Sequence, residues 1–210
     1  SRTILLLPLL VNEQTGGISA GIEVDEFKTF CGRYSYCWPR DAVFITEALD
    51  VIGMNDISEK FYSEFCKMTQ SRNGMWEQRF FTDGRLAPCW GYQIDETASV
   101  IFGSYAHYKV CKSVNFLKEN LRMLEDGVEF LERYIDDLLN EKQKLPKSYD
   151  LWEEFEGVSL YSISSIYAAF SAMVSIYNVL KEEYADNVSK IELIDCLLYT
   201  SPSPRDPKTS

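Results

Sequence analysis

A chain of 210 residues with 46% hydrophobic and 25% charged residues has the composition of a folded protein and not of a disordered one. Its formal net charge of −11 leaves no basic stripe to neutralise phosphates, which argues against nucleic acid and against an anionic membrane surface as partners. A neutral ligand fits this charge better, and the 4 Trp, 13 Tyr and 12 Phe are compatible with sugar rings packing on aromatic faces.

The cysteines and the single histidine limit the chemistry that the chain can carry. Six cysteines are scattered without a Cys-x-x-Cys pair and His107 is the only histidine, so we predict no metal site and no cofactor. Scattered thiols, together with the lack of a basic leader before the first apolar stretch, predict a cytoplasmic protein. One histidine also weakens Ser–His–Asp and Cys–His interpretations, so we expect carboxylates to do the chemistry and His107 to be structural.

Apolar residues recur at alternating steps of three and four along most of the chain, which predicts an all-α fold. In chain order, the predicted helices contain residues 2–12, 42–52, 61–68, 94–108, 117–138 and 163–180. We expect no apolar run that approaches the length needed to span a bilayer, which is about 20 residues.

Capping residues give the predicted helix boundaries. Gly53 is expected to end the second helix, Asp56 or Ser58 to cap the third, and Ser113 to cap the long one.

Long irregular segments at 13–39, 72–93 and 141–157 separate these helices, and such loops usually carry function. Residues 196–210 contain Leu-Leu-Tyr-Thr-Ser-Pro-Ser-Pro, which resembles a translated sequencing adapter. We therefore expect a domain over 1–195 followed by a non-native, disordered tail. A Pro/Ser-rich tail, the alternative, would also be disordered.

Two adjacent carboxylates, Glu153 and Glu154, follow Trp152 in the segment 148–157, which we call the Trp–Glu segment. Glycosidic cleavage needs a carboxylic acid that is protonated near neutral pH, and burial against an aromatic ring beside a second negative charge raises a carboxyl pKa. The alternative is that these acids complement the dipole of the following helix.

The Arg–Asp segment, residues 34–41, ends in Arg40 and Asp41, a pair that can hold sugar hydroxyls between aromatic side chains. The alternative is a surface ion pair with Asp41 in the first turn of a helix. A further group of polar and aromatic residues runs from Trp76-Glu77-Gln78-Arg79 to residues 90–97, which we call the Gln–Asp segment. Its tryptophans could equally be core, and Asp95 and Glu96 could be acids at the start of a helix.

The order and the sequences of these segments resemble those of family 15 glycoside hydrolases. The matching stretches are "YCWPRDA" at 36–42, "WGYQIDETA" at 90–98 and "YDLWEE" at 149–154, and "LLVNEQTGGISAGIEV" at 9–24 resembles the family's entry into its barrel. The resemblance covers roughly residues 2–185 and looks closest to the bacterial and archaeal branch.

The resemblance implies an (α/α)6 barrel, of which about the first half is present, and an inverting, exo-acting hydrolase. The expected substrate is an α-glucan or a maltooligosaccharide, from whose non-reducing end β-glucose is released. Glu153 would be the general acid and Glu154 would contact the sugar on the leaving-group side. An inverting enzyme also needs a carboxylate base about 6.5–9.5 Å from the acid, and no residue here matches that base of the family.

Motif matching also implies which residues bind the sugar. Arg40 and Asp41 would hold the hydroxyls of the terminal glucose, with Tyr34 and Trp38 as the wall of that subsite. Trp90 would be an aromatic platform, although one residue fewer than in fungal members separates it from the Gln-x-Asp motif. The remaining motif residues expected at the substrate are Gln93, Asp95 and Trp152.

Two alternatives stay open. The same fold and glucose-binding motifs would serve an α,α-trehalase or a glucodextranase-type enzyme. A non-catalytic carbohydrate-binding helical protein is the other class; a downstream glutamate base in the full-length protein would favour the enzyme, and its absence would favour the binding protein.

Overall fold

The computed structural model describes residues 2–22, 34–89, 91–140 and 147–181. In these ranges the chain is helical, with only isolated β-bridges besides, so the predicted all-α class is confirmed. The elements are α1 (Arg2–Leu6), the 3-10 turn Leu7–Leu10, α2 (Pro39–Val51), α3 (Asn55–Lys60), the π-helical turn Phe61–Cys66, α4 (Lys67–Thr69), α5 (Ile94–Cys111), α6 (Val114–Leu139) and α7 (Leu160–Lys181).

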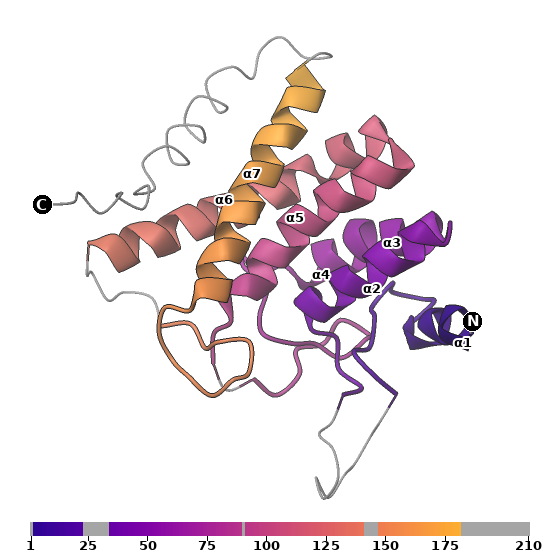
Figure 1. The fold of residues 1–210 in the computed structure, drawn as a ribbon, viewed down its shortest axis with the longest axis horizontal. Helices are drawn as coiled ribbons and strands as arrows, with labels where there is room; N and C mark the ends of the chain where they lie inside the picture. The colour runs from indigo at the N-terminus through magenta and orange to yellow at the C-terminus, as the bar shows by residue number, and fades with distance from the viewer. Residues whose placement is uncertain (1, 23–33, 90, 141–146, 182–210) are drawn as a thin grey trace, which may run out of the picture.

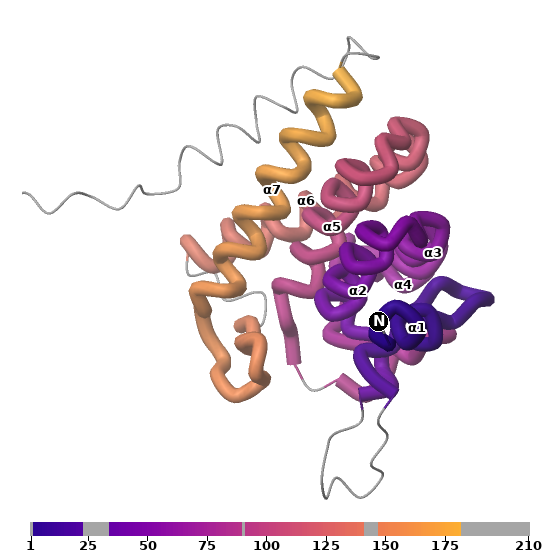
Figure 2. Tube along the Cα trace, turned by 45° about the vertical axis from the view of Figure 1, so that its right-hand side comes forward, coloured from indigo at the N-terminus to yellow at the C-terminus, as the bar shows by residue number. Residues whose placement is uncertain are grey.

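Helix α5 is at the centre of this arrangement. It packs against α2 on one side and α7 on the other, and α6 runs back along α5 and α7 (Figures 1 and 2). Helices α2, α5 and α7 all begin at the end of the molecule where the long connections lie, at the bottom of Figure 1. We call this end the loop end.

The core between the helices is rich in aromatic side chains. The π-helical turn is buried through Phe61, Tyr62 and Phe65, and the rings of Phe61 and Phe65 stack with centroids 5.7 Å apart. Trp76 is 1% exposed and donates its indole N–H to the carbonyl of Cys66 at 2.9 Å, so the loop after α4 is held against the core.

Helix boundaries follow the predicted capping residues only in part. Ser113 Oγ accepts a hydrogen bond from the Phe116 N–H at 3.2 Å, and Gly53, with φ +82°, follows the end of α2, as predicted. The predicted cap of the third helix is wrong, because α3 begins at Asn55 and both Asp56 and Ser58 lie inside it. Ser58 instead donates to a carbonyl of α2 at 3.1 Å.

Helix α7 is more apolar than sequence reasoning expected. Its 22 residues are long and apolar enough to cross a membrane by length and composition, so the expectation that no run approaches that length is wrong. Half of its most apolar stretch is buried inside the molecule, where it packs against α5 and α6. A helix covered on several sides needs apolar residues around most of its circumference.

His107, on α5, is fully buried, and its Nδ1 lies 2.9 Å from Asp50 Oδ2 of α2. Its ring packs edge-on against Phe116 at 4.7 Å between centroids. These contacts agree with the structural role expected of the histidine.

The close approach of α2 and α5 depends on Gly103. A Cβ added there would lie 2.6 Å from a methyl carbon of Val43 and 2.6 Å from the hydroxyl oxygen of Tyr62. We expect Gly103→Ala to lower the free energy of unfolding by about 1–3 kcal/mol, because the added methyl group forces the two helices apart. Urea unfolding followed by circular dichroism measures this change, with Val110→Ala on the exposed face of α5 as the control. Equal midpoints for Gly103→Ala and the unchanged protein would contradict this packing.

Candidate active site

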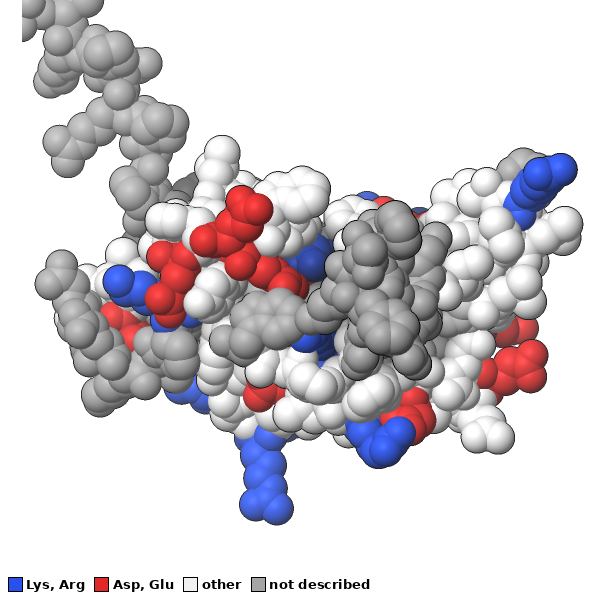
Figure 3. Space-filling view, turned by 90° about the horizontal axis from the view of Figure 1, so that it is seen from below, with Lys and Arg blue, Asp and Glu red and all other residues white. Residues whose placement is uncertain are grey.

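All three motif segments meet at the loop end of α2, α5 and α7. The backbones of Cys37 and Phe80 exchange two hydrogen bonds of 2.8 Å, which join the Arg–Asp segment to the loop that precedes α5. The N–H of Tyr149 donates to the carbonyl of Tyr92 at 2.7 Å, which joins the Trp–Glu segment to the Gln–Asp segment. Figure 3 looks at this end of the molecule and shows acidic and basic side chains interspersed on it.

Arg40 lies in a buried group of carboxylates at the start of α2 and α5. Its Nη1 donates to Asp95 Oδ2 at 2.7 Å and lies 3.0 Å from Glu96 Oε1, while Nη2 donates to Asp41 Oδ2 at 3.2 Å. The side chains of Arg40, Asp95 and Glu96 are 9%, 0% and 0% exposed, whereas that of Asp41 is 41% exposed. The burial of Arg40 argues against a surface ion pair, whereas Asp41 does lie in the first turn of α2, as that alternative expected. Asp41 is the member of the group that solvent reaches.

Burial sets the electrostatics of this group. It raises the pKa of Glu96 well above its ordinary value and raises that of Asp95, although the positive charge of Arg40 opposes both shifts. Burial also disfavours the charge of Arg40, but Glu96, Asp95 and Asp41 outweigh this and raise the pKa of its guanidinium. The guanidinium is therefore permanently charged, while burial disfavours the ionised forms of the two acids.

An aromatic layer lies beside this group. Trp38 and Tyr36 are 7% and 8% exposed, and the Arg79 guanidinium lies over both rings at 5.3 Å and 5.1 Å from their centroids. Arg79 Nε donates to the carbonyl of Pro88 at 2.7 Å, which fixes the guanidinium on the rings. Tyr34, the other predicted wall residue, is 48% exposed.

Three bonds from the start of α5 hold the Trp–Glu segment. Besides the Tyr149–Tyr92 bond, Gln93 Nε2 donates to the carbonyl of Asp150 at 3.0 Å, and the N–H of Ile94 donates to Ser148 Oγ at 3.0 Å. The predicted substrate residue Gln93 therefore acts on the backbone of the segment that carries Glu153. It is itself 3% exposed.

Within the Trp–Glu segment the chain forms a closed turn. Asp150 Oδ1 accepts the N–H groups of Glu154 and Phe155 at 2.9 Å each, and the N–H of Glu153 donates to the carbonyl of Asp150 at 3.0 Å. Glu153 has φ +61°, a conformation that non-glycine residues rarely adopt and that is enriched at functional sites. The turn thus fixes the backbone of Glu153 in a strained position.

The surroundings of the two glutamates differ from the sequence-based expectation. Helix α7 begins only at Leu160 and has no acidic residue in its first turn, so the helix-dipole alternative does not apply. Trp152 is 78% exposed and so supplies little of the burial expected around Glu153, which is partly buried, while Glu154 is exposed. Trp90 lies outside the described residues.

The structure thus joins Arg40, Asp41 and Asp95 directly and links Gln93 to the turn of Glu153. Sequence reasoning missed Glu96 as a partner of Arg40, although its place beside Asp95 in the motif was a signal. Arg79 lies in the stretch 76–79 that the sequence singles out, but sequence reasoning gave it no role, and the structure places its guanidinium over the rings of Tyr36 and Trp38. In the described part of the chain, no group of three or more His, Cys, Asp or Glu side chains is arranged to hold a metal ion.

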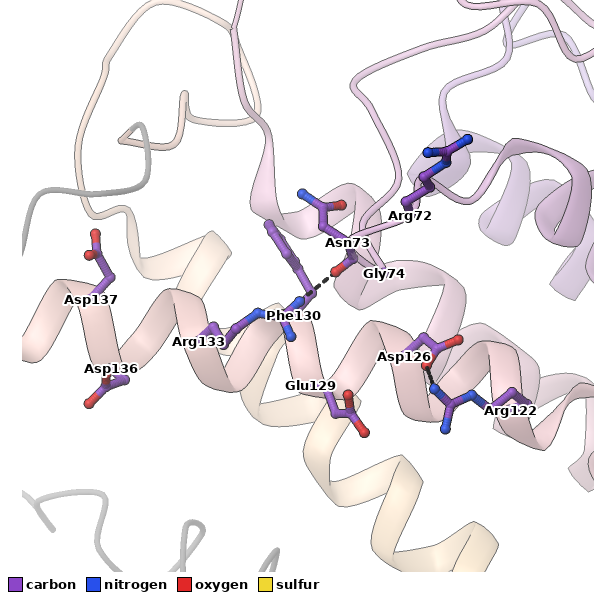
Figure 4. Close-up of a pocket in the computed structure, with 10 residues that line it drawn as sticks. All are labelled: Arg72, Asn73, Gly74, Arg122, Asp126, Glu129, Phe130, Arg133, Asp136 and Asp137. Carbon is purple, nitrogen blue, oxygen red and sulfur yellow. Dashed lines mark hydrogen bonds and ion pairs between the residues drawn. The ribbon is translucent and has the colours of Figure 1, made fainter.

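A separate groove of about 620 Å³ lies along α6 and the turn before Met75 (Figure 4). Its charged groups are partly paired with each other: Arg122 with Asp126 at 2.6 Å, and Arg133 with the carbonyl of Asn73. The groove includes none of the predicted site residues.

The chain is similar in sequence and in structure to known proteins. The chain is 26% identical over 176 residues to an uncharacterized glycosyl hydrolase of Methanocaldococcus jannaschii, over 84% of this chain and 26% of the relative. Its structure matches a wild-type glycosidase with a TM-score of 0.70 at 16% identity, over 94% of this chain and 53% of that one. It matches a glucoamylase from Saccharomycopsis fibuligera with a TM-score of 0.71 at 15% identity, over 94% and 45%. No family model matches the chain.

These matches confirm the resemblance to glycoside hydrolases that the motifs indicate, and they confirm the fold. The described helices are those of the glucoamylase (α/α)6 fold, over about half of the matched chains. The chain spans about a quarter of the length of the curated relative.

The closed turn yields a test that needs no substrate. The backbone N–H of Phe155, and then that of Glu154, hold the pKa of Asp150 below its ordinary value. Because the pKa of Asp150 is lower in the folded state, its hydrogen bonds stabilise the fold at pH values above the unfolded pKa of about 3.9. This stabilisation is lost as the pH falls through the folded pKa. We expect Asp150→Ala to lower the protection of the Glu154 and Phe155 amides against hydrogen exchange, and Asp150→Asn, which keeps an oxygen acceptor, to lower it less. Equal protection in all three proteins would show that Asp150 does not close the turn.

Proposed function

We propose that the chain carries the acid side of the active site of an inverting glycoside hydrolase that releases glucose from the non-reducing ends of α-glucans. The observation that carries this proposal is the meeting of the three motif segments at one end of the fold. The similarity in sequence to a glycosyl hydrolase, and in fold to glycosidases and a glucoamylase, supports the same class of enzyme.

In this proposal Glu153 is the general acid. Its turn is bound to the start of α5 through Gln93 and Ile94, which holds the backbone of Glu153 in place beside the helix that carries Asp95. The acid gives its proton to the glycosidic oxygen while the bond from that oxygen to the anomeric carbon breaks. In the same displacement a water molecule bonds to the anomeric carbon from the opposite face, and its proton goes to a carboxylate base contributed by the rest of the barrel.

The terminal glucose is bound by the exposed part of the Arg–Asp segment. Asp41 is the solvent-accessible carboxylate of the Arg40 group and accepts sugar hydroxyls, with Arg40 Nη2 beside it. Tyr34 and Trp152, both exposed, supply apolar faces for the pyranose rings. Asp95 and Gln93 are buried, so they act on the sugar through Arg40 and through the Trp–Glu segment.

Replacement of the acid gives the first test of this function. In a protein that carries the complete barrel, Glu153→Gln keeps the shape and removes the proton donor. We expect kcat on maltose to fall by about 10²–10⁴-fold with a small change in KM, and aryl α-glucosides with acidic leaving groups to lose much less. Glu156→Gln, on the same turn, is the matched control. Wild-type turnover of maltose by Glu153→Gln would exclude Glu153 as the acid.

The configuration of the product gives the second test. Attack of water from the face opposite the leaving group converts an α-linkage into β-glucose. We expect proton NMR of the first glucose formed from maltose to show the β-anomer, before mutarotation. Initial release of α-glucose would overturn the inverting mechanism, and hydrolysis of trehalose or isomaltose in preference to maltose would favour the related activities on the same fold.

A further inference from the structure

Glu96 holds Arg40 at two places. Its Oε2 accepts the backbone N–H of Arg40 at 2.7 Å, and its Oε1 lies 3.0 Å from Arg40 Nη1. This backbone N–H belongs to the first turn of α2, where the N–H groups have no acceptor within the helix. Trp38, the N-cap residue just before α2, provides no side-chain acceptor. Glu96, on α5, therefore caps α2 and orients the Arg40 side chain with the same carboxyl group.

The carboxyl groups around Arg40 have more acceptors than donors. Asp95 Oδ1 and Glu96 Oε1 are buried, and neither receives a hydrogen bond from the described residues, although Glu96 Oε1 is ion-paired with Arg40 Nη1. Oxygens of Asp95 and Glu96 lie around the same nitrogen atom, Arg40 Nη1. One cation therefore faces two fully buried acids, and a buried charge without a partner is costly.

A single proton shared by the two acids removes this excess. It cancels one negative charge and turns one acceptor oxygen into a donor that can bond to a neighbouring acceptor. Besides Arg40, the titratable groups that act on Glu96 come from α2, α5, α7 and the loops beside them: Asp41, Asp95, Tyr161, Cys37 and Cys89. These five groups are neutral or acidic, and the nearby cation Arg79, which also acts on Cys89, lies over the rings of Tyr36 and Trp38.

We propose that Glu96 is a positioning residue, which shares one proton with Asp95 and locks Arg40 and the first turn of α2 so that Asp41 faces the substrate. Asp41 follows Arg40 in the chain and bonds to its Nη2, so a shift of Arg40 moves Asp41 with it. The effect on the sugar rests on the proposed function, whereas the shared proton does not depend on it.

Three variants in the protein with the complete barrel test the positioning role. Glu96→Ala removes both contacts, and we expect KM for maltooligosaccharides to rise about tenfold or more, with a smaller fall in kcat. Glu96→Gln keeps an acceptor oxygen for the Arg40 N–H and is uncharged like the protonated acid, so we expect KM within about twofold of wild type near neutral pH. Glu47→Gln, on α2 but outside the group, is the control for loss of one negative charge.

The pH dependence separates positioning from simple support of the fold. As the pH rises and the pair loses its proton, we expect wild-type KM to rise, while KM of Glu96→Gln stays level over the same range. Wild-type KM in a folded Glu96→Ala protein would overturn the positioning role. If KM of Glu96→Gln rises as much as KM of Glu96→Ala, the proposal of a shared proton is wrong.

A measurement without substrate keeps the two proposals distinguishable. Carbon-13 NMR of the side-chain carboxyl groups, assigned through Glu96→Gln, reports directly on protonation. We expect the pair to titrate well above the ordinary range of about 4 for such acids. If both carboxyl groups are ionised near neutral pH, the shared proton is wrong, even if the protein hydrolyses maltose. If the pair of acids holds the proton but no glucoside is hydrolysed, the proposed function is wrong, whereas the shared proton between Asp95 and Glu96 is confirmed.

Discussion

The contact between Arg40 and the two acids at the start of α5 is the interaction on which the rest of the loop end depends. It joins the first turn of α2 to the first turn of α5, and α5 in turn holds the Trp–Glu segment through Gln93 and Ile94. Removing one partner from a buried ionic group leaves the others desolvated and unpaired, which costs far more than the loss of a surface pair. The relative position of the residues predicted to bind sugar and of the turn that carries Glu153 is therefore set by buried polar contacts, and the helices supply the frame.

The fold could be predicted further than the site. Periodicity predicts the helices because an apolar stripe at helical spacing is typical of a helix packed on one face, as in α6, where the stripe from Leu117 to Leu138 lies inside the helix Val114–Leu139. The bond between Glu96 and Arg40 joins residues 56 positions apart, and no local pattern specifies it. The closed turn at Asp150 is likewise hidden in the sequence, because two acids ahead of an apolar stripe usually begin a helix. The composition of α7 shows the same limit, since a packed helix of a barrel and a membrane helix can have similar residues.

The connections at the two ends of the helices differ in kind. Away from the loop end, residues 52–54 join α2 to α3 and residues 112–113 join α5 to α6, so these turns do little more than reverse the chain. At the loop end the connections before α2, α5 and α7 are long and, with the first turns of α2 and α5, carry all the predicted site residues that lie in the described part of the chain. Because of this separation, the sequence of the short turns and of the helix contacts is constrained by folding alone, and not by the candidate site. Changes in sequence can then accumulate in the long connections, as long as the residues that start α2 and α5 continue to hold these connections in place.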